Sequence, residues 1–122
     1  MKAVGDTFIV SNPTNKREHF YIVIGLTANG DPIAVNLTTT DIGRSTSFLD
    51  KGEHPWITQR SAVNFWDCKR PMSLAALEQG VRQRIVRPGV PIAGSVVNRI
   101  IDAAQLSRLF PDVLKRYLSL QA

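Results

Sequence analysis

Two histidines, His19 and His54, are the side chains of this chain best suited to acid–base chemistry near neutral pH. His54 lies between Gly52 and Pro55, in a turn that cannot be a regular strand, because proline has no ladder donor and restricts the residue before it. A loop histidine can shuttle a proton in a reaction or simply cap a turn. Both histidines therefore have a catalytic and a structural interpretation.

The stretch from Phe48 to Arg70 contains both tryptophans, the single cysteine and His54. Trp56 and Trp66 can stack on nucleic-acid bases, which is worth about 1–3 kcal/mol per base, although a core position is the ordinary role of at least one of them. Ser61 follows His54, but no Gly-x-Ser-x-Gly elbow is present, so a serine hydrolase is not favoured. Ser61 equally suits the cap of a turn.

Basic residues exceed acidic ones, with 15 Lys plus Arg against 10 Asp plus Glu and a formal net charge of +5. A further basic pair, Lys16 and Arg17, lies in a polar loop. Between residues 60 and 87 only Asp67 and Glu78 oppose a basic cluster made of Arg60, Lys69, Arg70, Arg82, Arg84 and Arg87. Such clustering favours a polyanion such as single-stranded RNA, although a basic surplus also serves solubility alone.

With one cysteine, Cys68, the chain has no internal disulfide, which indicates a reducing compartment. One Cys and two His are too few for a zinc site with several such ligands, so we expect neither a metal nor another cofactor. The N-terminal stretch MKAVGDTFIV has a single lysine and no long apolar run, so we expect no signal peptide and no membrane span. The sequence predicts a soluble, cytoplasmic protein.

The first half of the chain has the composition and spacing of β-strands. The run Phe20–Ile24 is nearly continuous in β-branched and aromatic residues, which is typical of a strand buried on both faces. Asn29-Gly30 predicts a tight antiparallel hairpin after it. Strands are predicted over residues 6–11, 20–24, 33–38 and 61–66, with a weaker one within 42–49. A small antiparallel barrel is the expected form of the sheet.

Past Pro71 the apolar spacing changes to that of helices. Ser73 is predicted to cap a short helix, Ser95 a second, and Pro111 to open a third, with a short strand at 83–87 between the first two. Strands followed by helices make an α+β architecture. We expect one domain over residues 1–122, with the barrel at about 5–70 and the helices at about 73–121.

Four features carry a resemblance to a known family. They are Gly5-Asp6 before the first strand, the basic loop with Lys16 and Arg17, the hydroxyl cluster Thr38–Thr40 and the stretch GEHPWITQRSAV. Over roughly residues 5–105 the order of elements resembles the MazF/PemK-type toxin endoribonucleases. The resemblance implies an SH3-like antiparallel barrel with C-terminal helices, a toxin–antitoxin function, a homodimer and an antitoxin protein as a partner.

The resemblance also implies cleavage of single-stranded RNA through attack of a ribose 2′-hydroxyl on its own phosphate, which needs a base, an acid and a cation on the phosphorane. The family's loop arginine matches Arg17, with Lys16 as its nearest substitute, and its hydroxyl residue at the end of the third strand matches Thr39 or Thr38. The predicted catalytic residues are Arg17, His54, His19 and Thr39. The predicted RNA-binding residues are Lys16, Arg60, Trp56, Ser61, Lys69 and Arg70.

The predicted function is therefore a toxin-like endoribonuclease that needs no metal. The alternative is a non-catalytic module on the same SH3-like fold that binds nucleic acid or a protein. Only the first of these requires that RNA be cut, so the fate of the RNA separates them, whereas binding does not.

Affinity for single-stranded RNA should fall as the salt concentration rises, because phosphate contacts by Lys and Arg release condensed counterions. Titrating the protein into labelled single-stranded RNA at several salt concentrations measures the slope of the dissociation constant against salt. Binding that is absent at low salt, or indifferent to salt, would exclude nucleic acid as the ligand.

Overall fold

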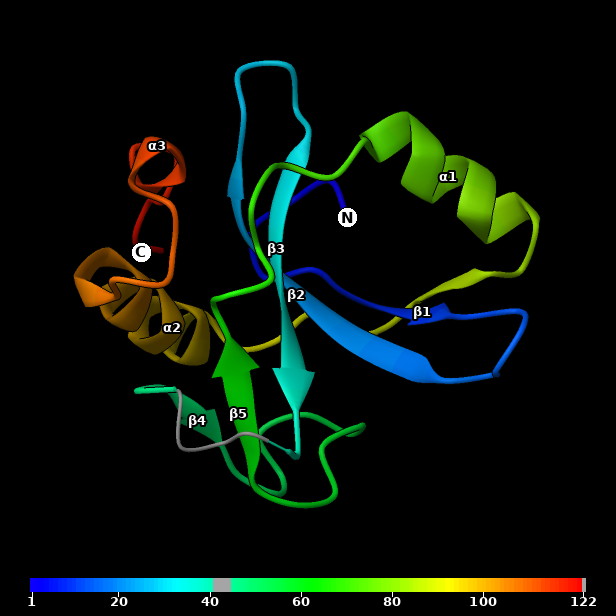
Figure 1. Ribbon diagram of the computed structural model, residues 1–122, viewed down its shortest axis with the longest axis horizontal. Coiled ribbons are helices and arrows are strands. Elements are labelled where there is room, and N and C mark those ends of the chain that lie inside the picture. The colour runs from blue at the N-terminus through cyan, green and yellow to red at the C-terminus, as the bar shows by residue number, and fades with distance from the viewer. Residues whose placement is uncertain (41–44, 122) are drawn as a thin grey trace.

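The computed structural model describes residues 1–40 and 45–121, and these form an antiparallel sheet with helices on both of its faces (Figure 1). The strands are β1 (Thr7–Ser11), β2 (Glu18–Leu26), β3 (Pro32–Thr38), β4 (Phe48–Leu49), β5 (Ser61–Asn64) and β6 (Val86–Pro88). The helices are α1 (Leu74–Arg82), α2 (Gly94–Leu106) and α3 (Asp112–Lys115). The expected α+β class is confirmed.

Strand β2 is the longest strand and pairs with β1 on one side and β3 on the other. Its side chains alternate between two apolar cores: Ile22 and Ile24 enter the larger core, and Val23 enters the smaller. All three are fully buried. The prediction of a strand buried on both faces is confirmed.

The two cores occupy opposite faces of the sheet. The larger core lies under α2 and α3, which contribute Val97, Ile100 and Leu114 among others. The smaller core lies under α1, where Leu77 meets Phe8 of β1. Figure 1 shows α1 on one side of the sheet and α2 with α3 on the other.

The hairpin that joins β2 to β3 is the turn predicted from Asn29-Gly30. Gly30 has a positive φ of 83°, and its N–H donates to the carbonyl of Thr27 at 2.9 Å. A conformation of this kind is easy for glycine because it has no Cβ. The sequence placed this antiparallel connection correctly.

The closure of the sheet into a small barrel is not seen among the described residues. The strand order is β4-β5-β3-β2-β1-β6, and within residues 1–40 and 45–121 no ladder joins β4 to β6. Strand β6 comes from the C-terminal half of the chain and pairs with β1 through Val10 and Val86. The weak strand expected within 42–49 is β4, and residues 42–44 of that range lie outside the described residues.

The helix starts were predicted with mixed success. Ser73 caps α1 as expected, because its hydroxyl accepts a hydrogen bond from the N–H of Ala76 at 3.1 Å. The predicted cap at Ser95 is wrong: α2 begins at Gly94, and Ala93 is the capping residue. The N–H of Ile92 donates to the carbonyl of Gly5, so the chain is already held just before α2 by the segment that precedes β1. Among residues 45–121 no helix is long and apolar enough to cross a membrane.

Gly25 in β2 should not tolerate a side chain, because a Cβ there would lie 2.8 Å from the carbonyl oxygen of Tyr117. We expect Gly25→Ala to lower the free energy of unfolding by about 1–3 kcal/mol through overpacking, as measured by urea denaturation. Gly94→Ala is the matched control, since its nearest new contact is an ordinary 3.6 Å to Gln121. Equal stability of the two variants would contradict the close approach of the C-terminal segment to β2.

Candidate functional site

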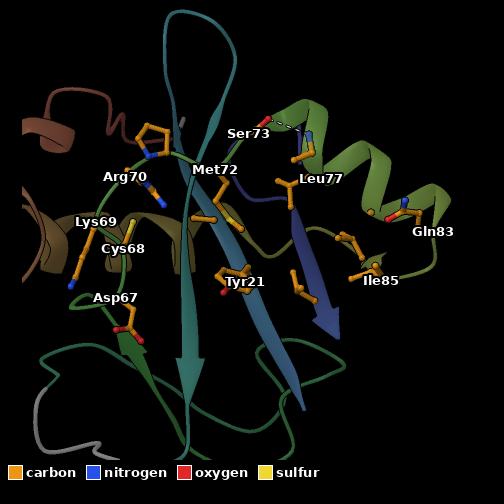
Figure 2. A pocket seen from close by; sticks show the side chains of 16 residues that line it. Tyr21, Asp67, Cys68, Lys69, Arg70, Met72, Ser73, Leu77, Gln83 and Ile85 are labelled. Atoms are coloured by element: carbon orange, nitrogen blue, oxygen red, sulfur yellow. Dashed lines mark hydrogen bonds between the residues drawn. The ribbon is translucent and has the colours of Figure 1, made fainter. Parts of the chain in front are cut away.

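A groove of about 910 Å³ lies between α1 and the sheet (Figure 2). Its floor comes from Val10, Tyr21 and Ala34 on β1, β2 and β3, and its walls come from the segment Asp67–Ser73 and from α1. A smaller hollow of about 190 Å³ adjoins it and shares Tyr21, Ala34, Asp67 and Cys68. We call the two together the α1-side groove.

The groove exists because α1 covers only part of its sheet face. Gly80 lets the helix approach β6 closely, since a Cβ at this position would lie 2.5 Å from a methyl group of Val86. Farther along the same face, the side chains change from apolar to polar with Asn36 on β3 and Asn64 on β5, which are opposite each other in the ladder. The α1-side groove therefore has an apolar end at the helix and a polar end beyond it.

Asn64 fixes the carboxylate at the polar end. Its side-chain amide donates to Oδ2 of Asp67 at 2.8 Å, and its amide oxygen accepts from the N–H of Asp67 at 3.1 Å. One of these bonds joins the two side chains and the other joins the Asn64 side chain to the backbone three residues on, a local arrangement that ends β5. The carboxylate of Asp67 is thus oriented while the residue stays exposed.

Tyr21 forms the aromatic part of the floor, and Figure 2 shows it between the segment Asp67–Arg70 and α1 in this view. Its ring stacks on Phe8 with centroids 5.2 Å apart. Burial raises the pKa of the Tyr21 phenol, with smaller contributions from the charge of Asp67 and from Cys68. The phenol therefore stays protonated at physiological pH and can donate a hydrogen bond.

The thiol of Cys68 is not a nucleophile in this setting. The residue is buried, and this burial raises the pKa of its thiol to about 11. Because the thiolate is the reactive form, the protonated thiol near neutral pH has little nucleophilic character. Within the described residues no cluster of three or more His, Cys, Asp or Glu is placed to hold a metal ion.

Three of the predicted residues line the α1-side groove. His19 lines its smaller hollow from β2, whereas Lys69 and Arg70 line the larger one from the loop after β5. All three are exposed, and within residues 1–40 and 45–121 none has a hydrogen bond or ion pair from its side chain. An imidazole and two cations are therefore open to a ligand on one side of the sheet.

His54 lies on the opposite face and is only 3% exposed. Its Nδ1 accepts from the N–H of Trp56 at 3.1 Å, so a neutral ring carries its proton on Nε2, which lies 2.8 Å from the carbonyl oxygen of Val90. Nε2 is also 3.3 Å from the hydroxyl of Thr7. Both ring nitrogens are occupied, and the ring joins the loop after β4 to β1 and to the segment after β6.

A separate hollow of about 210 Å³, outside the α1-side groove, brings together Thr39, Trp56 and Ser61. Trp56 packs edge-on against Phe20, with ring centroids 5.7 Å apart, and the Ser61 hydroxyl donates to a backbone carbonyl two residues away. Neither His54 nor Arg17 lines it. The predicted site residues are thus divided between the two faces of the sheet.

The remaining predicted cations lie outside these hollows. Lys16 and Arg17 are exposed in the connection between β1 and β2, where Lys16 has a positive φ of 58°. Arg17 immediately precedes β2 and stands two residues before His19. Arg60 is exposed, lies over the ring of Phe48 and pairs with Asp50 at 3.5 Å.

Four residues at the site were not predicted: Tyr21, Asn36, Asn64 and Asp67. The available signal was a polar residue at an inward position of an otherwise apolar strand, as with Asn36 in PIAVNLT and Asn64 in SAVN. A buried amide in such a strand needs a partner, and where it has none it is a candidate ligand contact. Asp67 follows β5 by only a few residues and is oriented through Asn64.

The two histidines should differ in their effect on stability. His54→Ala removes the ring's hydrogen bonds and opens a cavity, so we expect the free energy of unfolding to fall by about 2–4 kcal/mol. His19→Ala removes an exposed side chain, and its effect should be within about 0.5 kcal/mol. Urea denaturation of the two variants measures this difference, and a destabilisation by His19→Ala as large as that by His54→Ala would refute the assignment.

Comparisons with protein-family models, with curated proteins and with solved structures each found no match. The function must therefore be argued from the side chains of the α1-side groove.

Proposed function

We propose that the protein binds single-stranded RNA in the α1-side groove and cleaves it without a metal ion. The proposal is supported above all by the placement of His19, an exposed imidazole on the same side of the sheet as the exposed cations Lys69 and Arg70. An imidazole can move a proton near neutral pH, and cations hold phosphates.

Binding is the first part of the proposal. Lys69 and Arg70 have no ion-pair partner within the described residues, so a phosphate need not displace a carboxylate to reach them. Tyr21 gives the groove an aromatic floor next to these cations. A cationic edge beside an aromatic surface is how many proteins bind single strands, with phosphates on the cations and bases on the rings.

Cleavage is the second part. His19 accepts the proton of a ribose 2′-hydroxyl while that oxygen attacks the adjacent phosphorus. The bond from phosphorus to the 5′-oxygen breaks, that oxygen takes up a proton from water, and the products are a 2′,3′-cyclic phosphate and a 5′-hydroxyl. Arg17, two residues before His19, offsets the charge that develops on the phosphorane.

The resemblance to the MazF/PemK toxins extends the proposal. In this view the chain is a divergent member of that family, and its antiparallel sheet corresponds to the family's SH3-like barrel. The chain then forms a homodimer and has an antitoxin protein as its partner. The role of Arg17 comes from this resemblance, whereas the role of His19 rests on its place in the groove.

A non-catalytic binding module is the second candidate, and one observation favours it. The family has an arginine in the strand before the helices, where this chain has Val63, which is fully buried, and Asn64, whose amide is engaged by Asp67. One cation of the family's site is therefore missing at this position. A module of this kind would keep the basic edge and bind RNA without cutting it.

Substitution at His19 and Arg17 separates the two candidates. We expect His19→Ala to slow cleavage of a mixed single-stranded RNA pool by about 100-fold or more, and Arg17→Ala to slow it by about 100-fold, with much smaller losses in binding. Cleavage by the unchanged protein should persist in excess chelator and leave 2′,3′-cyclic phosphate ends, as identified by mass spectrometry.

Arg108→Ala is the matched control for the loss of one exposed positive charge, because Arg108 lies after α2, on the other side of the sheet. Its cleavage rate should equal that of the unchanged protein. If the purified protein binds the RNA pool but leaves it intact, cleavage is excluded and the binding module is the function to retain.

A further inference from the structure

We propose that the polar end of the α1-side groove is a pocket for an unpaired guanine, recognised by Asp67 and Asn36. This inference rests on the proposed binding of single-stranded RNA and names the base that the site selects. It concerns binding alone and does not depend on whether the RNA is cut.

The first observation is the side chain of Asn36. It is only 8% exposed and lines the smaller hollow, yet within residues 1–40 and 45–121 its amide has no hydrogen bond. The amide is not sealed off: among the described residues the one fully buried side-chain polar atom without a partner is Ser47 Oγ, so the Asn36 amide reaches the space of the hollow. An amide that is held at the wall of a hollow and has no protein partner can form its hydrogen bonds with a ligand there.

The second observation is the carboxylate of Asp67 at the same hollow. Oδ2 accepts one hydrogen bond from Asn64, which fixes the plane of the carboxylate, while Oδ1 has no partner in the described part of the chain. Asn64, which holds this carboxylate, is directly opposite Asn36 in the ladder, and Asp67 and Asn36 both line the smaller hollow. The hollow thus offers two carboxylate oxygens beside an amide donor.

This donor and acceptor pattern matches one base. Guanine is the only common RNA base whose pairing edge carries two adjacent donors, N1–H and the N2 amino group, followed by an acceptor, O6. The donors suit the two oxygens of Asp67, and O6 suits the amide of Asn36. Adenine and cytosine place a ring nitrogen acceptor beside their amino group, and uracil flanks its single donor with carbonyl oxygens, so each would set an acceptor against the carboxylate.

The surroundings are compatible with this ligand. Tyr21 lines both parts of the groove and supplies an aromatic surface and a protonated phenol beside the base. Lys69 and Arg70 are close to Asp67 in the chain and exposed, so their charges offset the repulsion between its carboxylate and an RNA backbone. A carboxylate among cations lowers the affinity for RNA of any sequence. In exchange, it raises the affinity for one base relative to the others, which is how specificity arises.

The test uses short oligouridines with 2′-O-methyl riboses, which cannot be cut, carrying one central guanine, inosine, adenine or cytosine. Fluorescence anisotropy of the unchanged protein should show guanine binding about five-fold or more tighter than each of the others. Inosine lacks only the N2 amino group, so it isolates one hydrogen bond to Asp67 without any change in the protein.

Two variants carry the test further. Asp67→Asn should abolish the preference for guanine, and Asn36→Ala should reduce it, while binding of oligouridine itself is retained. Asp102→Asn is the matched control, since Asp102 is an exposed aspartate on α2 and should leave the preference unchanged. If Asp67→Asn instead tightens all oligonucleotides equally, the carboxylate acts only through its charge and the guanine pocket is excluded.

The two proposals fail in distinguishable ways. Salt-dependent binding of all oligonucleotides with equal affinity would overturn the guanine pocket and leave RNA binding intact. Absence of binding to any of them at low salt would overturn both.

Discussion

The double burial of β2 is the constraint on which the rest of this fold depends. Its residues Ile22, Val23 and Ile24 are fully buried and point alternately into two cores, so both faces of the sheet must be covered at the middle of the strand. Fully burying an apolar side chain of this size stabilises the fold by roughly 1.5–3 kcal/mol. Two layers are therefore required, one from α2 with α3 and one from α1.

The α1 layer is too short for the face that it covers. The nine residues of α1 span about 14 Å at the rise of an α-helix, whereas the nine residues of β2 span about 30 Å. One end of that face therefore has no helix above it, and there β2, β3 and β5 carry His19, Asn36 and Asn64 in place of apolar residues. The polar end of the groove is thus the part of the sheet that a short helix leaves open.

The sequence predicted correctly those elements whose conformation is set by contacts between residues close together in the chain. The run Phe20–Ile24, the turn at Gly30 and the cap at Ser73 each depend on neighbours within a few residues, and all three were predicted correctly. The pairing of β1 with β6 joins residues that are far apart in the chain, and the start of α2 depends on a hydrogen bond from Ile92 to Gly5. Local patterns carry no information on such partners, so the sheet order and the cap of α2 could not be read from them.

The difference between local and distant contacts also explains why His54 is buried whereas His19 is exposed. Nothing near His54 in sequence identifies Thr7 and Val90, the distant residues that meet its Nε2. These contacts hold the loop after β4 against the larger-core face of the sheet, where Trp56 and Phe20 pack beside the ring. The α1-side groove lies on the opposite face. His19 lines that groove together with Tyr21 and Asn36, and its ring is exposed because no distant segment among the described residues packs on it as Thr7 and Val90 do on His54.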